Sequence, residues 1–381
     1  MSSTIAESSN GAESAVLDLH KKFIETNQSS PDFLALNRKA LGQFAKLKFP
    51  HRKHEMYTFV NTKGLASAPF SLKKESSIQR EFVEQHVYAG CERSHLTLVD
   101  GVLRPELSDA TALGTAVMVG SLAEAIKDKS VKSLLQESIE SENDVFASIN
   151  SAFMTQGIMI RVGRDNQIEA PLQILNVSTG GKSGPVMTVP RVYVHLEPLS
   201  ELKLIVKYVG EGDNYFVNSV QDMVVEENAT LTHIQVQADS TDAWHFSKNR
   251  VRLKRDSRYL GYQATNGARL VRHHNEGWLS EPGAELVLNG VSVLVDDEQS
   301  HQFIRVHHEV ENCTSHQCFK NIINHRARAS FDGTVVVNKG AQLTNSDQLI
   351  NNLMLSDEGH ADCKPNLMIF VYHELSTSCM E

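Results

Sequence analysis

Cysteines, long apolar runs and N-terminal targeting features are scarce in this sequence. The five cysteines among 381 residues are too few and too scattered for a disulfide scaffold. No apolar run approaches the ~18 residues that a transmembrane helix needs. The Ser-rich, acidic N-terminus lacks the basic and apolar regions of a signal peptide. We therefore expect a cytoplasmic protein in a reducing compartment, with no membrane partner.

Positive charge is also in short supply. Lys and Arg number 37 against 46 Asp and Glu, a formal net charge of −9. A dispersed acidic balance argues against a nucleic-acid partner, because phosphate binding needs clustered cations. The hydrophobic fraction of 41% is ordinary for a folded protein. The length predicts two or three domains, or one elongated body.

The first part of the chain, residues 1–156, is predicted to be a helical region, and we expect its first 12 residues to be disordered. Apolar residues recur at helical spacing in residues 14–25, 31–48, 113–138 and 145–153. Pro31 follows two serines and is typical of the first turn of a helix.

From residue 157 to residue 372 the chain reads as a succession of short strands. Apolar and polar residues alternate in most runs, as in residues 230–237, and Gly, Asn, Asp or Pro separate them. The absence of long helical patterns disfavours a doubly wound α/β sheet or a TIM barrel. A sandwich, a barrel and a parallel β-helix stay open, because no clear repeat is visible. The long series of strands in one region favours the β-helix.

The segment from His307 to Cys318 is the densest collection of potential metal ligands. It contains His316 and Cys318, which would share one face of a strand, and Cys313, which precedes them. Imidazole and thiolate are ligands for zinc, iron and iron–sulfur centres. The spacing matches no complete metal motif, so ordinary strand positions, with Cys as a small buried residue, are the favoured interpretation.

Two other motifs carry weaker signals. Residues 176–183 end in Gly-Lys-Ser but lack the first glycine and the following helix of a phosphate loop. His273 and His274 are adjacent, so their side chains would diverge on a strand. We expect them to be an exposed pair beside a turn at Gly277.

Several segments in order resemble the SufB/SufD family of iron–sulfur cluster assembly proteins, and SufD more than SufB. The resemblance runs from about residue 35 to about residue 370 and includes residues 98–108, 148–160, 308–320, 331–333, 341–357 and 364–367. The positions that match the family motifs are Arg52, Lys53, Glu55, Tyr57, Asn150, Gln317, Lys320, Gly333, Gln342, Thr344, Gln348, Ser356, Lys364 and Pro365.

The resemblance implies a mainly β protein, a right-handed parallel β-helix with an N-terminal α-helical region. It implies a non-enzymatic scaffold subunit that pairs with SufB through the region 307–367 and works with the ATPase SufC. A cysteine desulfurase system would supply sulfur indirectly. The iron–sulfur cluster would be bound transiently in the complex, for which the resemblance also suggests a reduced flavin, and this chain alone would hold no cofactor tightly.

The ending departs from the family pattern. Residues 373–381 form an atypical tail in place of the family's Cys-Ser-His element and its helical domain that docks SufC, which puts SufC binding in doubt. His373 and Cys379 are the right chemical types in the wrong register. Two alternatives follow: a degenerate SufD-like protein that dimerises without assembling clusters, and a β-helix carbohydrate-active enzyme. Only Trp244 and Trp278 could serve the latter as sugar platforms.

Overall fold

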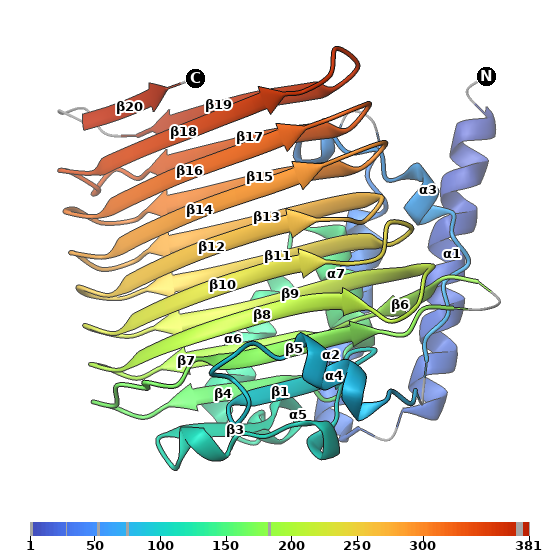
Figure 1. The fold of residues 1–381 in the computed structure, drawn as a ribbon, viewed down its shortest axis with the longest axis horizontal. Coiled ribbons are helices and arrows are strands. Elements are labelled where there is room, and N and C mark those ends of the chain that lie inside the picture. The colour runs from blue at the N-terminus through green and yellow to red at the C-terminus, as the bar shows by residue number, and fades with distance from the viewer. Residues whose placement is uncertain are drawn as a thin grey trace.

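The computed structural model describes residues 3–27, 29–51, 54–73, 76–181, 184–370 and 376–380. Two large sheets dominate it, and their strands stack into a β-solenoid of about seven turns. In Figure 1 the strands rise from β3 and β4 at one end to β19 and β20 at the other, and both termini lie near that second end. The predicted parallel β-helix with an N-terminal helical region is confirmed.

The first sheet has the order β2-β1-β5-β8-β10-β12-β14-β16-β18-β20. Its strands are parallel except for the β1–β2 pair. Their bounds are β1 His95–Val99, β2 Val102–Leu103, β5 Leu172–Ser178, β8 Glu201–Gly210, β10 Thr230–Ala238, β12 Arg258–Asn266, β14 Glu285–Leu294, β16 Thr314–Ile323, β18 Asn345–Met354 and β20 Ser376–Met380.

The second sheet has the order β19-β17-β15-β13-β11-β9-β7-β4-β3, with β6 also paired to β9. Only β3 and β4 pair antiparallel. The bounds are β3 Val117–Ser121, β4 Ile158–Val162, β6 Val186–Thr188, β7 Arg191–Leu196, β9 Tyr215–Val225, β11 Trp244–Leu253, β13 Leu270–Leu279, β15 Gln299–His308, β17 Arg328–Val337 and β19 His360–Ile369.

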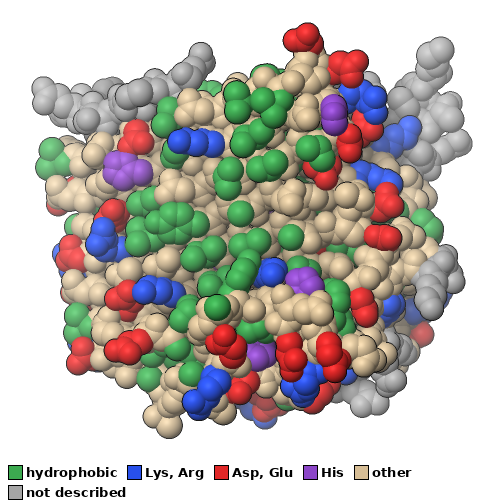
Figure 2. All heavy atoms as spheres, viewed as in Figure 1, with side chains coloured by type: hydrophobic (Ala, Val, Ile, Leu, Met, Phe, Trp, Pro, Cys, Tyr) green, Lys and Arg blue, Asp and Glu red, His purple; other side chains and the backbone are tan. Residues whose placement is uncertain are grey.

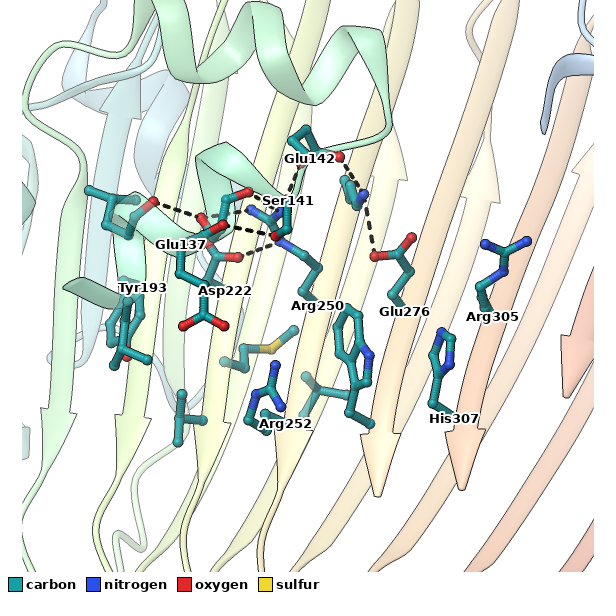
Figure 3. Close-up of a pocket in the computed structure, with 18 of the residues that line it drawn as sticks. Glu137, Ser141, Glu142, Tyr193, Asp222, Arg250, Arg252, Glu276, Arg305 and His307 are labelled. Atoms are coloured by element: carbon teal, nitrogen blue, oxygen red, sulfur yellow. Dashed lines mark hydrogen bonds and ion pairs between the residues drawn. The ribbon is translucent and has the colours of Figure 1, made fainter. Parts of the chain in front are cut away.

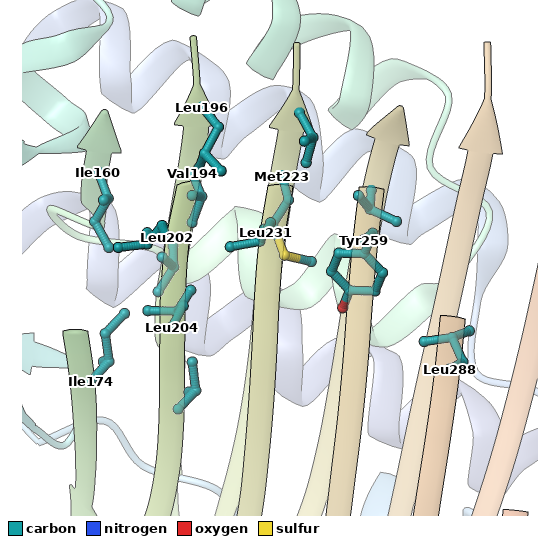
Figure 4. Close-up of a cluster of buried hydrophobic side chains, with 14 of the residues drawn as sticks. Ile160, Ile174, Val194, Leu196, Leu202, Leu204, Met223, Leu231, Tyr259 and Leu288 are labelled. Carbon is teal, nitrogen blue, oxygen red and sulfur yellow. The ribbon is translucent and has the colours of Figure 1, made fainter. Parts of the chain in front are cut away.

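The interior of the solenoid is filled by the inward-facing residue of every second strand position. Leu202, Leu204 and Leu231 of the first sheet meet Val194 and Met223 of the second in a core that is almost fully buried (Figure 4). A band of polar side chains crosses this core in the middle turns. There Asn249 donates to Gln235 at 2.9 Å and to Asn275 at 3.0 Å. These three buried amides therefore satisfy one another.

One corner of the solenoid repeats in every turn. Leu199, Asn228, Asp256, Gly283, Asn312 and Leu343, roughly 27 to 31 residues apart, all have positive φ. This conformation favours Gly, Asn and Asp. The next residue is small and buried each time: Ser200, Ala229, Ser257, Ala284, Cys313 and Thr344. The repeat lies in backbone conformation and residue size, and for that reason no clear sequence repeat was visible.

Helices of the N-terminal region cover the outer face of the second sheet. They are α1 Ser3–Thr26, α2 Pro31–Leu47, α3 Lys63–Ala66, α4 Arg80–His86, α5 Leu122–Ala125, α6 Lys129–Glu140 and α7 Val145–Phe153, with the 3₁₀ turns η1 Glu55–Tyr57, η2 Pro105–Leu107 and η3 Thr111–Leu113. Every residue of α7 is buried between α2 and the sheet. Phe146 packs edge-on against Phe246 of β11 with ring centroids 4.6 Å apart. The short helix α4 instead covers the first sheet near β5 and β8.

The structure differs from the predicted helical region in two places. Residues 113–138 are not one helix, because Val117–Ser121 forms β3 before α5 and α6 begin. There Val117 is buried and Met118 is 65% exposed, the alternation of a strand, and pairing with β4 outweighs local helix propensity. Helix α1 begins at Ser3, within the segment that we expected to be disordered.

Candidate functional site

The helical cover is attached to the second sheet by a buried charge cluster. Asp144, which caps α7 through the Phe146 amide, lies 2.9 Å from the Arg272 guanidinium. A second partner is His274, whose two ring nitrogens each lie 2.8 Å from a carboxylate oxygen, one of Asp144 and the other of Glu276.

The pKa values in this cluster follow from burial and neighbouring charge. Burial alone would raise the pKa of the Asp144 carboxyl, but Arg272 and His274 hold it well below its usual range. The pKa of Glu276 is also held well below its usual range, because Lys248 and His274 outweigh the effect of burial. Both carboxylates are therefore ionised inside the protein. They tie the loop before α7 to strands β11 and β13.

Family-motif positions from the two ends of the sequence meet beside this cluster. Tyr57 donates to Asp144 at 2.7 Å and lies under the Arg272 guanidinium, 4.3 Å from its ring centroid. Glu55 lies 3.5 Å from Lys364 of β19. The motif residues Arg52 and Lys53 lie outside the described residues. The early motif thus contacts the last turns of the solenoid.

Asn150 and the buried Arg191 hold α7 to β7 and β9. The Asn150 amide donates to the backbone oxygens of Pro190 at 3.0 Å and Asn218 at 2.6 Å. Arg191 donates to Asp222 at 2.5 Å and to Ser151 at 2.9 Å. These contacts give Asn150 a positioning role.

Other motif positions lie inside or at the corners of the last turns. Gln317 and Gln348 are in register on β16 and β18 and face the interior. Gly333 stands opposite Pro365, and a β-carbon at residue 333 would overlap the ring of Phe331. The remaining positions are the corner residues Gln342 and Thr344, the turn residue Ser356 after β18, and Lys320, exposed on the outer face of β16.

The cysteines and histidines that we considered as metal ligands do not converge. Cys313 is fully buried in its corner, where burial raises the pKa of the thiol to about 11. His316 and Cys318 share the outer face of β16, as predicted, and His316 contacts Asp347. Within the described ranges no group of three His, Cys, Asp or Glu side chains could hold a metal ion. His373 lies outside those ranges, and Cys379 is placed opposite Gln348 by the β18–β20 register.

The expectation of an exposed pair at His273 and His274 is wrong. The two side chains do diverge, but both are fully buried. His273 points into the solenoid and lies 2.7 Å from the Ser247 hydroxyl, while His274 belongs to the charge cluster. Gly277 lies within β13 and not in a turn. The helical cover, which the local pattern does not reveal, buries the outer side chain.

Exposed hydrophobic side chains gather at the C-terminal end of the solenoid. Half of the large hydrophobic side chains exposed in the described part of the chain lie between residues 343 and 370: Leu343, Leu353, Met354, Leu355, Leu367, Met368, Ile369 and Phe370. In the described residues β19 is the last strand of the second sheet. Figure 2 shows the face of the molecule that is turned to the viewer in Figure 1. Hydrophobic side chains lie over the middle and upper part of that face, and most charged ones lie along its margins. We call β18, β19 and these side chains the open end.

Stacked parallel strands in two sheets, with helices over one outer face, define a covered β-solenoid protein. Family models match nearly the whole chain: the SufBD protein N-terminal region over residues 12–174, and the SufBD core domain of the SUF system for FeS cluster assembly over residues 177–373. The chain belongs to the SufBD family of iron–sulfur cluster assembly proteins.

Similar proteins occur in bacteria and plants. An iron–sulfur cluster assembly SufBD family protein of Synechocystis is 27% identical over 89% of this chain and 77% of its own length. The iron–sulfur cluster assembly protein SufD of Escherichia coli is 26% identical over 87% of this chain and 76% of its own length. The chloroplastic protein ABCI7 of Arabidopsis thaliana is 26% identical over 84% of this chain and 69% of its own length. Of the helices described, none is long and apolar enough to cross a membrane.

Proposed function

We propose that this chain is a non-catalytic SufD-like subunit of the iron–sulfur assembly scaffold, which pairs with SufB through the open end. The observation that carries the proposal is the concentration of exposed hydrophobic side chains on the last turns. An edge strand also presents unpaired backbone groups, which can pair with a strand of another chain.

The cluster is the cargo of such a scaffold and needs soft ligands. Because the His and Cys residues described here do not converge, we propose that SufB supplies most cluster ligands at the shared surface. Work with SufC and the cysteine desulfurase system, and a cytoplasmic location, are parts of the same proposal.

A flavin would need a flat ring face to stack on. In the cleft between α6 and the outer face of the second sheet, Arg252, Trp278 and His307 are consecutive in the strand register. The rings of Trp278 and His307 are stacked with their centroids 5.5 Å apart, and Arg252 lies over the Trp278 ring. These residues do not fit an isoalloxazine ring, so any flavin of the complex would be held elsewhere. The same packing disfavours a sugar-binding platform, as does Arg269, which lies over the ring of Trp244.

The test is co-purification with SufB, followed by anaerobic cluster reconstitution. The variant Met368→Glu with Phe370→Glu places two charges on the open end, where burying them unpaired costs several kcal/mol. We expect the unchanged chain to pair with SufB and this variant to lose pairing. The matched control is Met118→Glu, which adds a charge at an exposed site on β3 at the other end of the same sheet; it should pair normally.

Failure of the unchanged chain to pair with SufB would refute the scaffold role and leave the degenerate-protein alternative. Equal pairing by the double variant and the control would place the SufB surface elsewhere on the molecule. A complex without sulfide-to-iron absorbance would separate pairing from cluster assembly.

A further inference from the structure

A cleft of about 390 Å³ lies between α6 and the outer face of the second sheet. Its floor is formed by strands β9, β11, β13 and β15, and its roof by α6 and the loop that follows it (Figure 3). Four carboxylates and four cationic side chains line it: Glu137, Glu142, Asp222, Glu276, Lys248, Arg250, Arg252 and Arg305.

Three of the carboxylates are already paired. Glu142 lies 2.7 Å from Lys248 and 2.8 Å from Arg250. Asp222 lies 2.6 Å from Arg250 and also contacts Arg191. Glu276 lies 3.3 Å from Lys248 and bonds His274. Lys248 and Arg250 are therefore paired as well, each with two of these carboxylates.

The other two cations lack such partners. Neither Arg252 nor Arg305 forms an ion pair within the described part of the chain, although Glu276 is beside Arg305 in the register. The Arg305 Nε is buried and without a hydrogen-bond acceptor among the described residues. Arg252 lies over Trp278, 5.5 Å from its ring centroid. Two guanidinium groups without a carboxylate partner thus line one cleft, which favours the binding of an anion.

The remaining acid, Glu137, is exposed on α6 at the rim. The local charge of the Arg252, Arg305 and Glu137 group is therefore positive, in a protein with a net charge of −9. The cleft also has an apolar wall, formed by Leu134, Tyr193 and Val224. An anion with a small organic group matches both properties.

We propose that this cleft binds a phosphate ester, with Arg252 and Arg305 on the phosphate and the organic group against the apolar wall. The two arginines stand on strands β11 and β15, which are two strand spacings or about 10 Å apart. Guanidinium groups reaching in from both sides can share the three oxygens of one phosphate, whereas a carboxylate offers two oxygens, enough for one bidentate contact. This site is independent of pairing with SufB.

The test uses the fluorescence of Trp278, in the full chain with Trp244→Phe so that Trp278 is the only tryptophan. The probes are ribose 5-phosphate and inorganic phosphate, with ribose as the uncharged control, and calorimetry repeats each titration. We expect saturable binding of ribose 5-phosphate, and of inorganic phosphate if the phosphate alone suffices, but none of ribose.

The variants Arg305→Gln and Arg252→Gln should each weaken binding at least about tenfold, the loss expected for a charged hydrogen bond. Arg305→Lys keeps the charge but loses the planar fork, so it should bind with intermediate affinity. The matched control Arg258→Gln removes the same charge from the exposed first sheet, where Arg258 pairs with Glu285; it should bind normally. Circular dichroism at matched temperatures checks folding of every variant.

Two results would overturn the proposal. One is the absence of saturable binding of either phosphate in the millimolar range. The other is equal affinity in the chain with both arginines, in Arg305→Gln and in Arg252→Gln, which would locate any binding outside the cleft.

Discussion

Cys313 occupies a corner position that small buried residues fill in every turn. Its sulfur lies 3.4 Å from the backbone oxygen of Glu281 and 3.5 Å from the backbone oxygen of Glu311. Burial raises the pKa of this group and so keeps it a thiol. At the equivalent corners the chain uses Ser, Ala or Thr. The environment therefore requires small size and not sulfur chemistry.

Substitutions of Cys313 should separate the requirement for a small side chain from a requirement for the thiol. We expect Cys313→Ala to cost about 1 kcal/mol or less of unfolding free energy and to leave cluster reconstitution with SufB unchanged. Cys313→Leu should cost about 1–3 kcal/mol through overpacking. Denaturant unfolding and the absorbance of the reconstituted complex measure both. Loss of cluster in a fully stable Cys313→Ala protein would assign the thiol a role as ligand.

Several buried histidines should make the free energy of unfolding depend on pH, at pH values above those at which carboxylates titrate. Burial lowers the pKa of His233 and His308 to about 4, and of His301 to about 3. An unfolded histidine has a pKa near 6.5, so below that pH the unfolded state takes up protons that the folded state does not.

Stability should therefore be full above about pH 6.5 and fall as the pH drops toward 4. Each such histidine should account for a loss of about 2 kcal/mol between pH 7 and pH 5. Urea unfolding of His233→Asn at the two pH values should show a smaller loss than the unchanged chain. His325→Gln, at an exposed histidine beside Asp296, should not alter the pH dependence. An unchanged slope in His233→Asn would contradict the prediction.

At the scale of elements, α7 and the loop before it hold the helical cover to the solenoid. Asp144 both caps this helix and neutralises Arg272 and His274. Asparagine caps a helix as well as aspartate does but carries no charge. Asp144→Asn therefore isolates the ionic contribution.

We expect Asp144→Asn to lower the free energy of unfolding by about 3–5 kcal/mol, because it leaves the buried Arg272 guanidinium without its ionic partner. The pKa of Asp144 is depressed in the folded state, so this contribution is present above the unfolded pKa of about 4 and is lost as the pH falls below it. The control is Asp128→Asn, at the exposed cap of α6. Equal stability of the two variants would show that the cluster contributes little.

For the whole molecule, the solenoid is supported unevenly along its length. Strands β9, β11 and β13 lie beneath the helical cover and carry one side of the amide network, whereas β18 and β19 carry exposed hydrophobic side chains. In a stacked fold each turn is stabilised mainly by its neighbours. Opening should therefore begin at the open end.

Hydrogen exchange should reveal this gradient. We expect the slowest amide exchange in β9, β11 and β13 and the fastest strand exchange in β19, where fewer buried contacts oppose local opening. Addition of SufB should slow exchange in β18 and β19 while leaving β4 and β7 unchanged. Uniform exchange along the solenoid, or protection by SufB only at the β3–β4 end, would contradict this view.

Much of the fold was predictable from local pattern. The alternation in residues 230–237 matches β10, and strands β4 to β19 fill the predicted range 157–372. Period-two alternation survives because one face of each strand always points into the core. The β3 strand escaped prediction because its pairing with β4 is tertiary, and the buried state of His274 escaped because helices from the distant N-terminus cover it.

The amino-acid sequence by itself determined the class of this protein: short alternating strands, a helical N-terminus and an ordered set of family motifs. Only the tertiary structure decided which chemistry-bearing residues meet. It separated Cys313 from His316 and Cys318, joined Glu55 to Lys364, and left Arg252 and Arg305 in a cleft with no ion pair to any described residue. The physical reason is that strand pattern is a local property of the chain, whereas burial and charge pairing depend on which turns and helices stack together.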